Sequence, residues 1–273
     1  MNLPLLPLCA QLCLLSYEKD AHKIIDGLVG LGLVYGGSFH DQGTDTQGYI
    51  CRGLTEPCMF VVFRGSQSVK DFIIDALAVP TPEFGLRRFC GGEEALVHLG
   101  FHEAWESVHE PVMAAVENFY KAEMRAQVVV TGHSLGAALA TLAAAEIGRV
   151  APALAISRLA LVNFGSPRVG TPAFVHMAED CIGAISRVVV EDDCVTTIPV
   201  APFAHVSGLL HLTRDGRVIG PLGRGWRFIW RHLGKWLRMQ WKQTRAVVSG
   251  KAFTDHHIEG YIHACRAYSE HDA

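Results

Sequence analysis

The chain has 273 residues, of which 49% are hydrophobic and 19% charged, and its formal net charge at pH 7 is −3. This hydrophobic content excludes an intrinsically disordered protein, and the slightly acidic charge excludes a chain built as a whole to bind nucleic acid. The length suits one globular unit, so we expect residues 1–273 to form a single domain.

The N-terminus carries an apolar run, Leu3–Leu15, that is similar to the start of a signal peptide. No Lys or Arg precedes the run, two prolines interrupt it, and no A-x-A cleavage pattern follows it. We therefore expect a cytoplasmic protein rather than a secreted one, with an amphipathic helix over Leu8–Tyr17. No stretch reaches the roughly 18–20 apolar residues that a membrane-spanning helix needs.

The chain contains eight cysteines but no C-x-x-C pair. The common zinc-ribbon and thioredoxin patterns are therefore absent. We expect the cysteines to be free and to fill the core, with disulfides as the alternative if the protein is secreted.

Short runs rich in Val, Ile and Leu alternate along the chain with segments of helical spacing. Such runs are typical of a parallel sheet covered by helices on both faces, which predicts an α/β fold. The predicted strands are Cys58–Phe63, Gln127–Thr131, Arg158–Phe164 and Ser186–Val190, and the predicted helices are His102–Lys121 and Leu135–Gly148.

A G-x-S-x-G sequence, Gly132 to Gly136, joins the strand at Gln127–Thr131 to the Ala-rich helix. A sharp turn here would raise the hydroxyl of Ser134 clear of the sheet, and glycines on both sides would avoid clashes with the strand and the helix. The helix N-terminus would direct backbone N–H groups at the same point. Because a strand precedes the sequence and a helix follows it, we interpret Ser134 as a nucleophile rather than a residue of an ordinary turn.

Four blocks of sequence then resemble, in order, the class 3 (fungal-type) lipase family of the α/β hydrolases. They are VVFRGS at 61–66, VVTGHSLG at 129–136, NFGSPRVG at 163–170 and RVVVEDDCVTTIP at 187–199. The resemblance implies the α/β-hydrolase fold, with a mostly parallel central sheet between helices. It also implies a serine carboxylester hydrolase, an acylglycerol lipase that needs no metal or organic cofactor. Alternatives are a phospholipase A1, an esterase for short or aromatic acyl groups, and a non-catalytic lipid-binding member.

A serine nucleophile needs a base and an acid that orients it, and in this fold the chain order is Ser, acid, His. Three acids follow the strand at Ser186–Val190, and the family register favours Asp193, with Asp192 as the alternative. The C-terminal sequence 255–261 resembles the family's histidine block, in which His256 fits the catalytic position. The adjacent His257 is the alternative for the catalytic histidine.

The oxyanion of the reaction needs at least two hydrogen-bond donors. One is the backbone N–H of Leu135, which directly follows the nucleophile. By resemblance, the second is the backbone N–H of Ser66, with the Ser66 hydroxyl as a third donor. The stretch 66–85 has apolar residues at helical spacing, and the resemblance implies a lid over the serine; a helix docked permanently on the sheet is the alternative.

A basic segment departs from the family pattern. Arg217–Thr254 carries nine Lys and Arg residues and no acid, so the rest of the chain has a net charge of −12. Within Trp226–Arg245 the cations follow one helical face, and four of the five tryptophans lie in the same stretch. This pattern predicts a basic, Trp-rich helical insertion at 224–248 that docks on a membrane or emulsion surface. The alternative is packing on the acidic body. We expect a lipid ester as substrate and no nucleic-acid partner, and the oligomeric state stays open.

Overall fold

The computed structural model describes residues 5–66, 86–89, 95–151, 158–219 and 255–271. Its centre is a seven-stranded sheet in the order β1-β2-β3-β6-β7-β8-β9, in which β1, β2 and β3 are antiparallel and the strands from β3 to β9 are parallel. The strands are β1 (Leu33–Asp41), β2 (Thr46–Gly53), β3 (Cys58–Phe63), β6 (Gln127–His133), β7 (Leu159–Phe164), β8 (Ala184–Val190) and β9 (Leu209–Leu212). A separate antiparallel pair joins β4 (Leu86–Arg88) to β5 (Leu96–His98).

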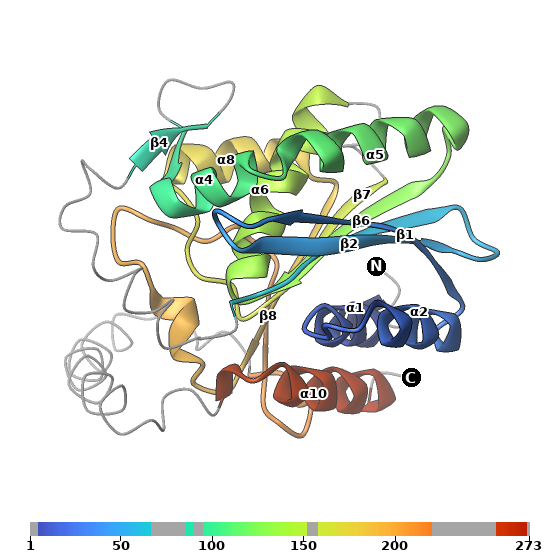
Figure 1. Cartoon of the computed structure of the whole chain (residues 1–273). Helices are drawn as coiled ribbons and strands as arrows, with labels where there is room; N and C mark the ends of the chain where they lie inside the picture. The colour runs from blue at the N-terminus through green and yellow to red at the C-terminus, as the bar shows by residue number, and fades with distance from the viewer. Residues whose placement is uncertain (1–4, 67–85, 90–94, 152–157, 220–254, 272–273) are drawn as a thin grey trace.

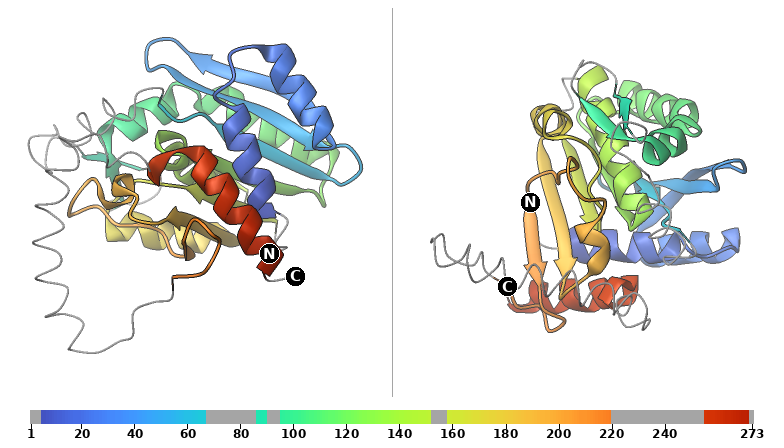
Figure 2. Two further views of the ribbon diagram at one scale, coloured as in Figure 1. Left: turned by 90° about the horizontal axis from the view of Figure 1, so that it is seen from below. Right: turned by 90° about the vertical axis from the view of Figure 1, so that its left-hand side faces the viewer.

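Helices cover both faces of the large sheet (Figure 1). One face carries α4 (Leu99–Glu106), α5 (His109–Ala122), α6 (Leu135–Val150) and α8 (Pro172–Cys181). The other face carries α1 (Leu5–Leu15), α2 (Ala21–Gly30) and α10 (Ile258–His271). Figure 2 shows α1 and α10 side by side on this second face of the sheet, although they come from opposite ends of the chain.

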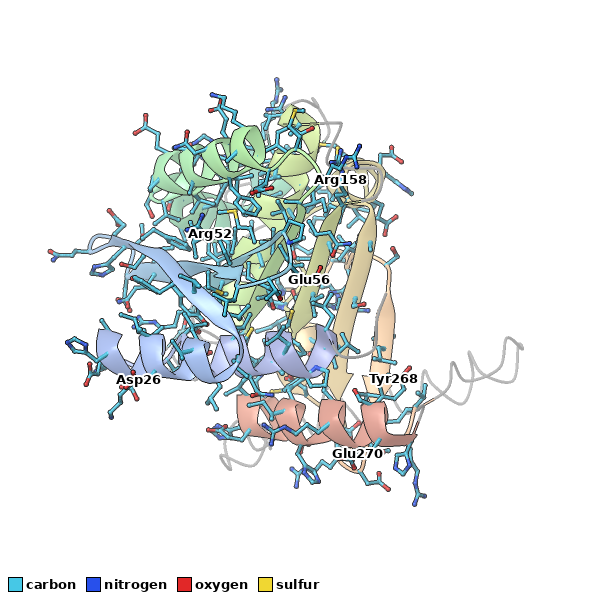
Figure 3. The ribbon with its side chains drawn as sticks, turned by 90° about the vertical axis from the view of Figure 1, so that its right-hand side faces the viewer. Asp26, Arg52, Glu56, Arg158, Tyr268 and Glu270 are labelled. Carbon is cyan, nitrogen blue, oxygen red and sulfur yellow. The ribbon has the colours of Figure 1, made fainter. Side chains whose placement is uncertain are left out.

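The inner strands are apolar on both sides because each side meets a helical layer. Every residue of β6 after Gln127 is buried, as are most residues of β7. Two cores result, one under α6 that contains Trp105 and one under α1 and α10 that contains Tyr261. The outer faces of the helices are polar, and Asp26 on α2 and Glu270 on α10 point away from the sheet (Figure 3). This confirms the predicted α/β-hydrolase fold with its mostly parallel sheet.

Three local features differ from the sequence-based expectations. The helix expected over His102–Lys121 is two helices, α4 and α5, because the backbone leaves the helical region at Val108 (φ −124°, ψ 4°). Pro111 then lies in the first turn of α5, where its missing N–H has no partner to lose. The hairpin of β1 and β2 was not anticipated, and α1 begins and ends slightly earlier than the helix expected at Leu8–Tyr17.

Two predicted features fall outside the described residues. Of the lid stretch 66–85, only Ser66 belongs to the described residues. The insertion at 224–248, including Trp226–Arg245, lies entirely outside them. The expectation of a single domain over 1–273 stays a prediction.

Among the described helices, none is both long enough and apolar enough to cross a bilayer. No disulfide joins any of the seven cysteines within the described ranges, and five of them are buried.

Candidate active site

Ser134 lies at the turn between the end of β6 and the start of α6. Its backbone has φ 60° and ψ −127°, a region that residues other than glycine rarely adopt. Methyl groups placed on Gly132 or Gly136 would lie 2.2 Å and 2.4 Å from backbone atoms of the turn and of β3, so both positions require glycine. The predicted sharp turn is therefore present. Ser134 is buried, and its Oγ has no hydrogen-bond partner among the described residues.

The helix that begins at Leu135 runs for 16 residues. The backbone N–H of Leu135 lies in its first turn, where N–H groups have no acceptor within the helix. This end of the helix also carries the positive end of the helix dipole. The N–H of Leu135, directly after Ser134, is thus available to a negative charge that develops near the Ser134 Oγ.

Asp193 follows β8 at the start of a short 3₁₀ helix, Cys194–Thr197, and is buried. Its Oδ1 accepts a hydrogen bond from the backbone N–H of Val195 at 2.9 Å, and its Oδ2 lies 2.8 Å from Nδ1 of His256. The alternative acid, Asp192, is exposed. Of these two acids, Asp193 is the one that contacts a histidine.

His256 precedes α10, and its ring is buried while His257 next to it is exposed. Because a carboxylate can only accept, Nδ1 of His256 carries the proton and donates it to Asp193. In the neutral ring this leaves a lone pair on Nε2, which is buried and has no partner among the described residues. An imidazole in this state can take a proton.

Tyr261 belongs to the site, although no role for it was predicted from the sequence. Its hydroxyl donates to Oδ2 of Asp193 at 2.5 Å, the same oxygen that His256 contacts. Burial, followed by the charge of Asp193, raises the pKa of Tyr261 well above its usual value, so the phenol stays protonated. The feature of the sequence that could have indicated Tyr261 is its position on the buried face of α10, five residues after His256.

The serine and the histidine are neighbours but not hydrogen-bonded. The ring of His133, the residue before Ser134, stacks on the ring of His256 with centroids 4.6 Å apart. Yet Ser134 Oγ and His256 Nε2 both lack a partner among the described residues. The structure therefore brings Asp193 and His256 into contact and leaves the Ser134–His256 hydrogen bond unmade.

Ser66 is half-buried and lies at the end of the segment that leaves β3. A methyl group placed on its neighbour Gly65 would lie 3.2 Å from Cβ of Ser134. The segment Gly65–Ser66 therefore passes directly beside the turn at Ser134.

His205, a histidine between the acid and the base in the chain order, lies beside the loop after Asp193. Its Nε2 donates to the backbone oxygen of Thr196 at 2.7 Å. Burial, and then the charge of Arg187, lowers the pKa of His205 to about 3. Its neutral ring braces the loop that presents Asp193.

Within the described part of the chain, no cluster of three or more His, Cys, Asp or Glu residues could hold a metal ion.

A family model described as "Lipase (class 3)" matches residues 60–203, just over half of the chain. The chain belongs to the class 3 lipase family. A lipase of Rhizomucor miehei is 35% identical over 170 residues, which are 61% of this chain and 43% of that protein. A solved structure described as a triacylglycerol lipase with a serine protease triad at its catalytic centre has a TM-score of 0.66 and 26% identity. The match covers 78% of each chain.

Secretion is the point at which a sequence-based expectation is wrong. A relative from Penicillium cyclopium, 38% identical over 131 residues, is named a secreted mono- and diacylglycerol lipase A. The match covers 48% of this chain and 39% of that protein. This relative contradicts the expectation of a cytoplasmic class 3 lipase. The chain spans about two fifths of the length of these two curated relatives.

Proposed function

We propose that this chain is a serine carboxylester hydrolase that cleaves acylglycerol esters through an acyl-enzyme on Ser134. His256 is the general base and Asp193 orients it. The backbone N–H groups of Leu135 and Ser66, with the Ser66 hydroxyl, stabilise the oxyanion. The Rhizomucor and Penicillium relatives, both named lipases, support this substrate class.

The observation that carries the proposal is the contact between His256 and Asp193. Its Nδ1–H donates to Asp193 at 2.8 Å, and its Nε2 is left as a buried, unpartnered acceptor beside Ser134. A hydrogen bond between Ser134 Oγ and Nε2 would give both of these unpartnered atoms a partner. Hydrogen bonds of this kind are often loose before substrate binds and tighten in the reacting complex.

The reaction proceeds in two acyl transfers. Ser134 Oγ attacks the ester carbonyl carbon as its proton passes to Nε2 of His256. The negative charge on the carbonyl oxygen is received by the N–H donors at Leu135 and Ser66. Collapse of the intermediate breaks the ester C–O bond, and Nε2 returns the proton to the departing alcohol. Water, deprotonated by the same nitrogen, then attacks the acyl carbon and frees the carboxylic acid and Ser134.

Hydrolysis of p-nitrophenyl esters of increasing acyl length, with and without an emulsion, tests this function. The matched control is Ser134→Ala, which removes only the Oγ. A lipase is expected to prefer longer chains at the interface, and Ser134→Ala is expected to abolish turnover. Equal rates on short soluble esters would demote the chain to an esterase. No turnover, together with no labelling of Ser134 by a fluorophosphonate, would make it a lipid binder.

We also propose that the enzyme docks on lipid through Trp226–Arg245. Support comes from the sequence alone, because a cationic face beside aromatic anchors is typical of a helix in a membrane interface. Cosedimentation with anionic vesicles is the test, with charge reversal at Arg227, Arg231 and Lys235. Binding that is absent, or unaffected by the reversal, would reject the interface role and leave the esterase chemistry untouched.

A further inference from the structure

Three side chains outside the proposed triad form a continuous hydrogen-bond chain beside it. Tyr17 lies two residues beyond the end of α1, and its hydroxyl oxygen is 2.7 Å from Nδ1 of His133. Nε2 of His133 is in turn 2.7 Å from the backbone carbonyl oxygen of His256. The chain thus runs from the N-terminal helix, through the residue before the nucleophile, to the main chain of the proposed base.

The direction of each hydrogen bond follows from the acceptor at one end. A carbonyl oxygen cannot donate, so Nε2 of His133 carries the proton. Its N–H donates a hydrogen bond to the backbone oxygen of His256. Nδ1 of the neutral ring is then an acceptor, and Tyr17 must donate its O–H to it. The oxygen of Tyr17 also receives a hydrogen bond from the backbone N–H of Gly65. Each group in the chain therefore has one defined role.

The surroundings keep this arrangement neutral. Burial, followed by the neighbouring His256, lowers the pKa of His133 well below its usual value. Burial likewise raises the pKa of Tyr17. Neither group changes its charge near neutral pH, so the hydrogen bonds keep their direction.

Ring stacking adds a second contact between His133 and the base. The two imidazole rings have centroids 4.6 Å apart and an interplanar angle of 30°. His133 thus contacts His256 twice: it donates a hydrogen bond to the backbone oxygen of His256, and it stacks on one face of the His256 ring. Asp193 holds the same ring by Nδ1. Together these contacts restrict the direction in which Nε2 can point.

Tyr17 also contacts the segment that carries the oxyanion donor. A methyl group placed on Gly65 would lie 2.1 Å from the Tyr17 hydroxyl oxygen and 2.6 Å from the backbone oxygen of His133. Glycine is therefore required at position 65. Gly65 thus lies in close contact with both the phenol of Tyr17 and the turn at Ser134.

We propose that Tyr17 and His133 are positioning residues, which hold His256 and the segment Gly65–Ser66 in register with Ser134. The inference rests on the proposed function and adds to it a device supplied by the N-terminal helix. Neither residue touches the ester. Their loss is expected to lower kcat while KM stays near its original value.

The first test compares two tyrosine variants, each of which removes one hydroxyl group near α1. Tyr17→Phe breaks the chain at His133. Tyr49→Phe is the matched control, because the buried Tyr49 donates to the carbonyl oxygen of Leu12 in α1 at 2.8 Å and takes no part in the chain. Rates are measured on a soluble p-nitrophenyl ester and divided by the concentration of protein that a fluorophosphonate titrates. Tyr17→Phe is expected to lower kcat about tenfold with KM changed less than about twofold, and Tyr49→Phe to leave both unchanged.

A second pair of variants tests the direction of the hydrogen bonds. Glutamine at position 133 can still donate to the His256 carbonyl, whereas leucine cannot. His133→Gln is expected to retain more of kcat than His133→Leu, so the conservative variant rescues part of the loss. If His133→Leu does not fold, the tyrosine pair decides.

The outcomes separate this inference from the function it rests on. If the unmodified enzyme neither turns over esters nor reacts with a fluorophosphonate, the proposed function fails. If it does both but Tyr17→Phe keeps its kcat, or Tyr49→Phe loses as much, only the positioning role is overturned.

Discussion

The hydroxyl of Tyr261 donates to Asp193 at 2.5 Å, and it does so to the very oxygen that His256 contacts. With Val195 on the other oxygen, the carboxylate receives donors on both sides. A buried carboxylate is costly without such partners. Tyr261 therefore helps to satisfy the buried carboxyl group of Asp193, which in the proposed mechanism orients His256.

Removal of this hydroxyl is expected to affect stability and turnover together. Tyr261→Phe should lower the free energy of unfolding by roughly 1.5–3 kcal/mol, because the lost hydrogen bond has a charged acceptor. It should also lower kcat severalfold, since Asp193 is held less firmly. Urea unfolding and ester hydrolysis measure the two effects. A variant with unchanged unfolding and unchanged kcat would show that Asp193 does not depend on the phenol.

Gly165 lies against Asp193 and His256 and cannot carry a side chain. Its φ is 56°, and a methyl group there would lie 2.7 Å from Asp193 Oδ2 and 2.9 Å from Cε1 of His256. Gly165→Ala is expected to push the two apart and to remove most activity. Gly260→Ala is the control, because a methyl group at this position in α10 would meet no other part of the described structure within 4 Å. That variant should keep its activity and gain about 0.5–1 kcal/mol of stability. Similar activity in both variants would contradict the close packing at Gly165.

The Ser66 hydroxyl is expected to act only in the transition state. Ser66→Ala should lose about 3 kcal/mol of transition-state stabilisation, or roughly 100-fold in kcat, with its melting temperature little changed. Steady-state kinetics and thermal unfolding measure the two. Unchanged turnover would remove the side chain from the mechanism, and the backbone N–H of Ser66 would remain as the donor.

Acid is expected to destabilise the fold through His205. Its folded-state pKa is about 3, whereas an unfolded histidine titrates near 6.5. As the pH falls from about 6.5 toward 3, the unfolded chain takes up a proton that the folded one refuses, so stability falls in this window by at most about 1.4 kcal/mol per pH unit. His205→Gln can still donate to Thr196 and should flatten the decline. Urea midpoints between about pH 6.5 and pH 4 measure it, and identical slopes would reject this role for His205.

Much of the fold could be predicted because its inner strands have no polar face. The runs at Cys58–Phe63 and Gln127–Thr131 are strands as expected, and Ser134 occupies the predicted turn. The hairpin of β1 and β2 was harder to predict from the sequence. It lies at the exposed edge of the sheet, where polar residues and glycines obscure the two-residue alternation typical of a strand. The break between α4 and α5 was missed because the apolar spacing continues across it.

The parts of the site that escaped prediction are contacts between distant segments. Asp193 could be preferred over Asp192 only by register, whereas burial separates the two at once. His133 lies inside the G-x-S-x-G sequence, but that sequence does not indicate its partners. Its hydrogen bonds to Tyr17 and to His256 span 116 and 123 residues of sequence, and no local pattern encodes them.

The most direct measurement is peptide mass spectrometry after treatment with a fluorophosphonate, on the folded protein and on His256→Ala. An adduct confined to Ser134, formed rapidly in the unmodified protein and far more slowly without the imidazole, is the result that the account predicts. A folded protein with no adduct at Ser134, or with one that forms equally fast in His256→Ala, would contradict it.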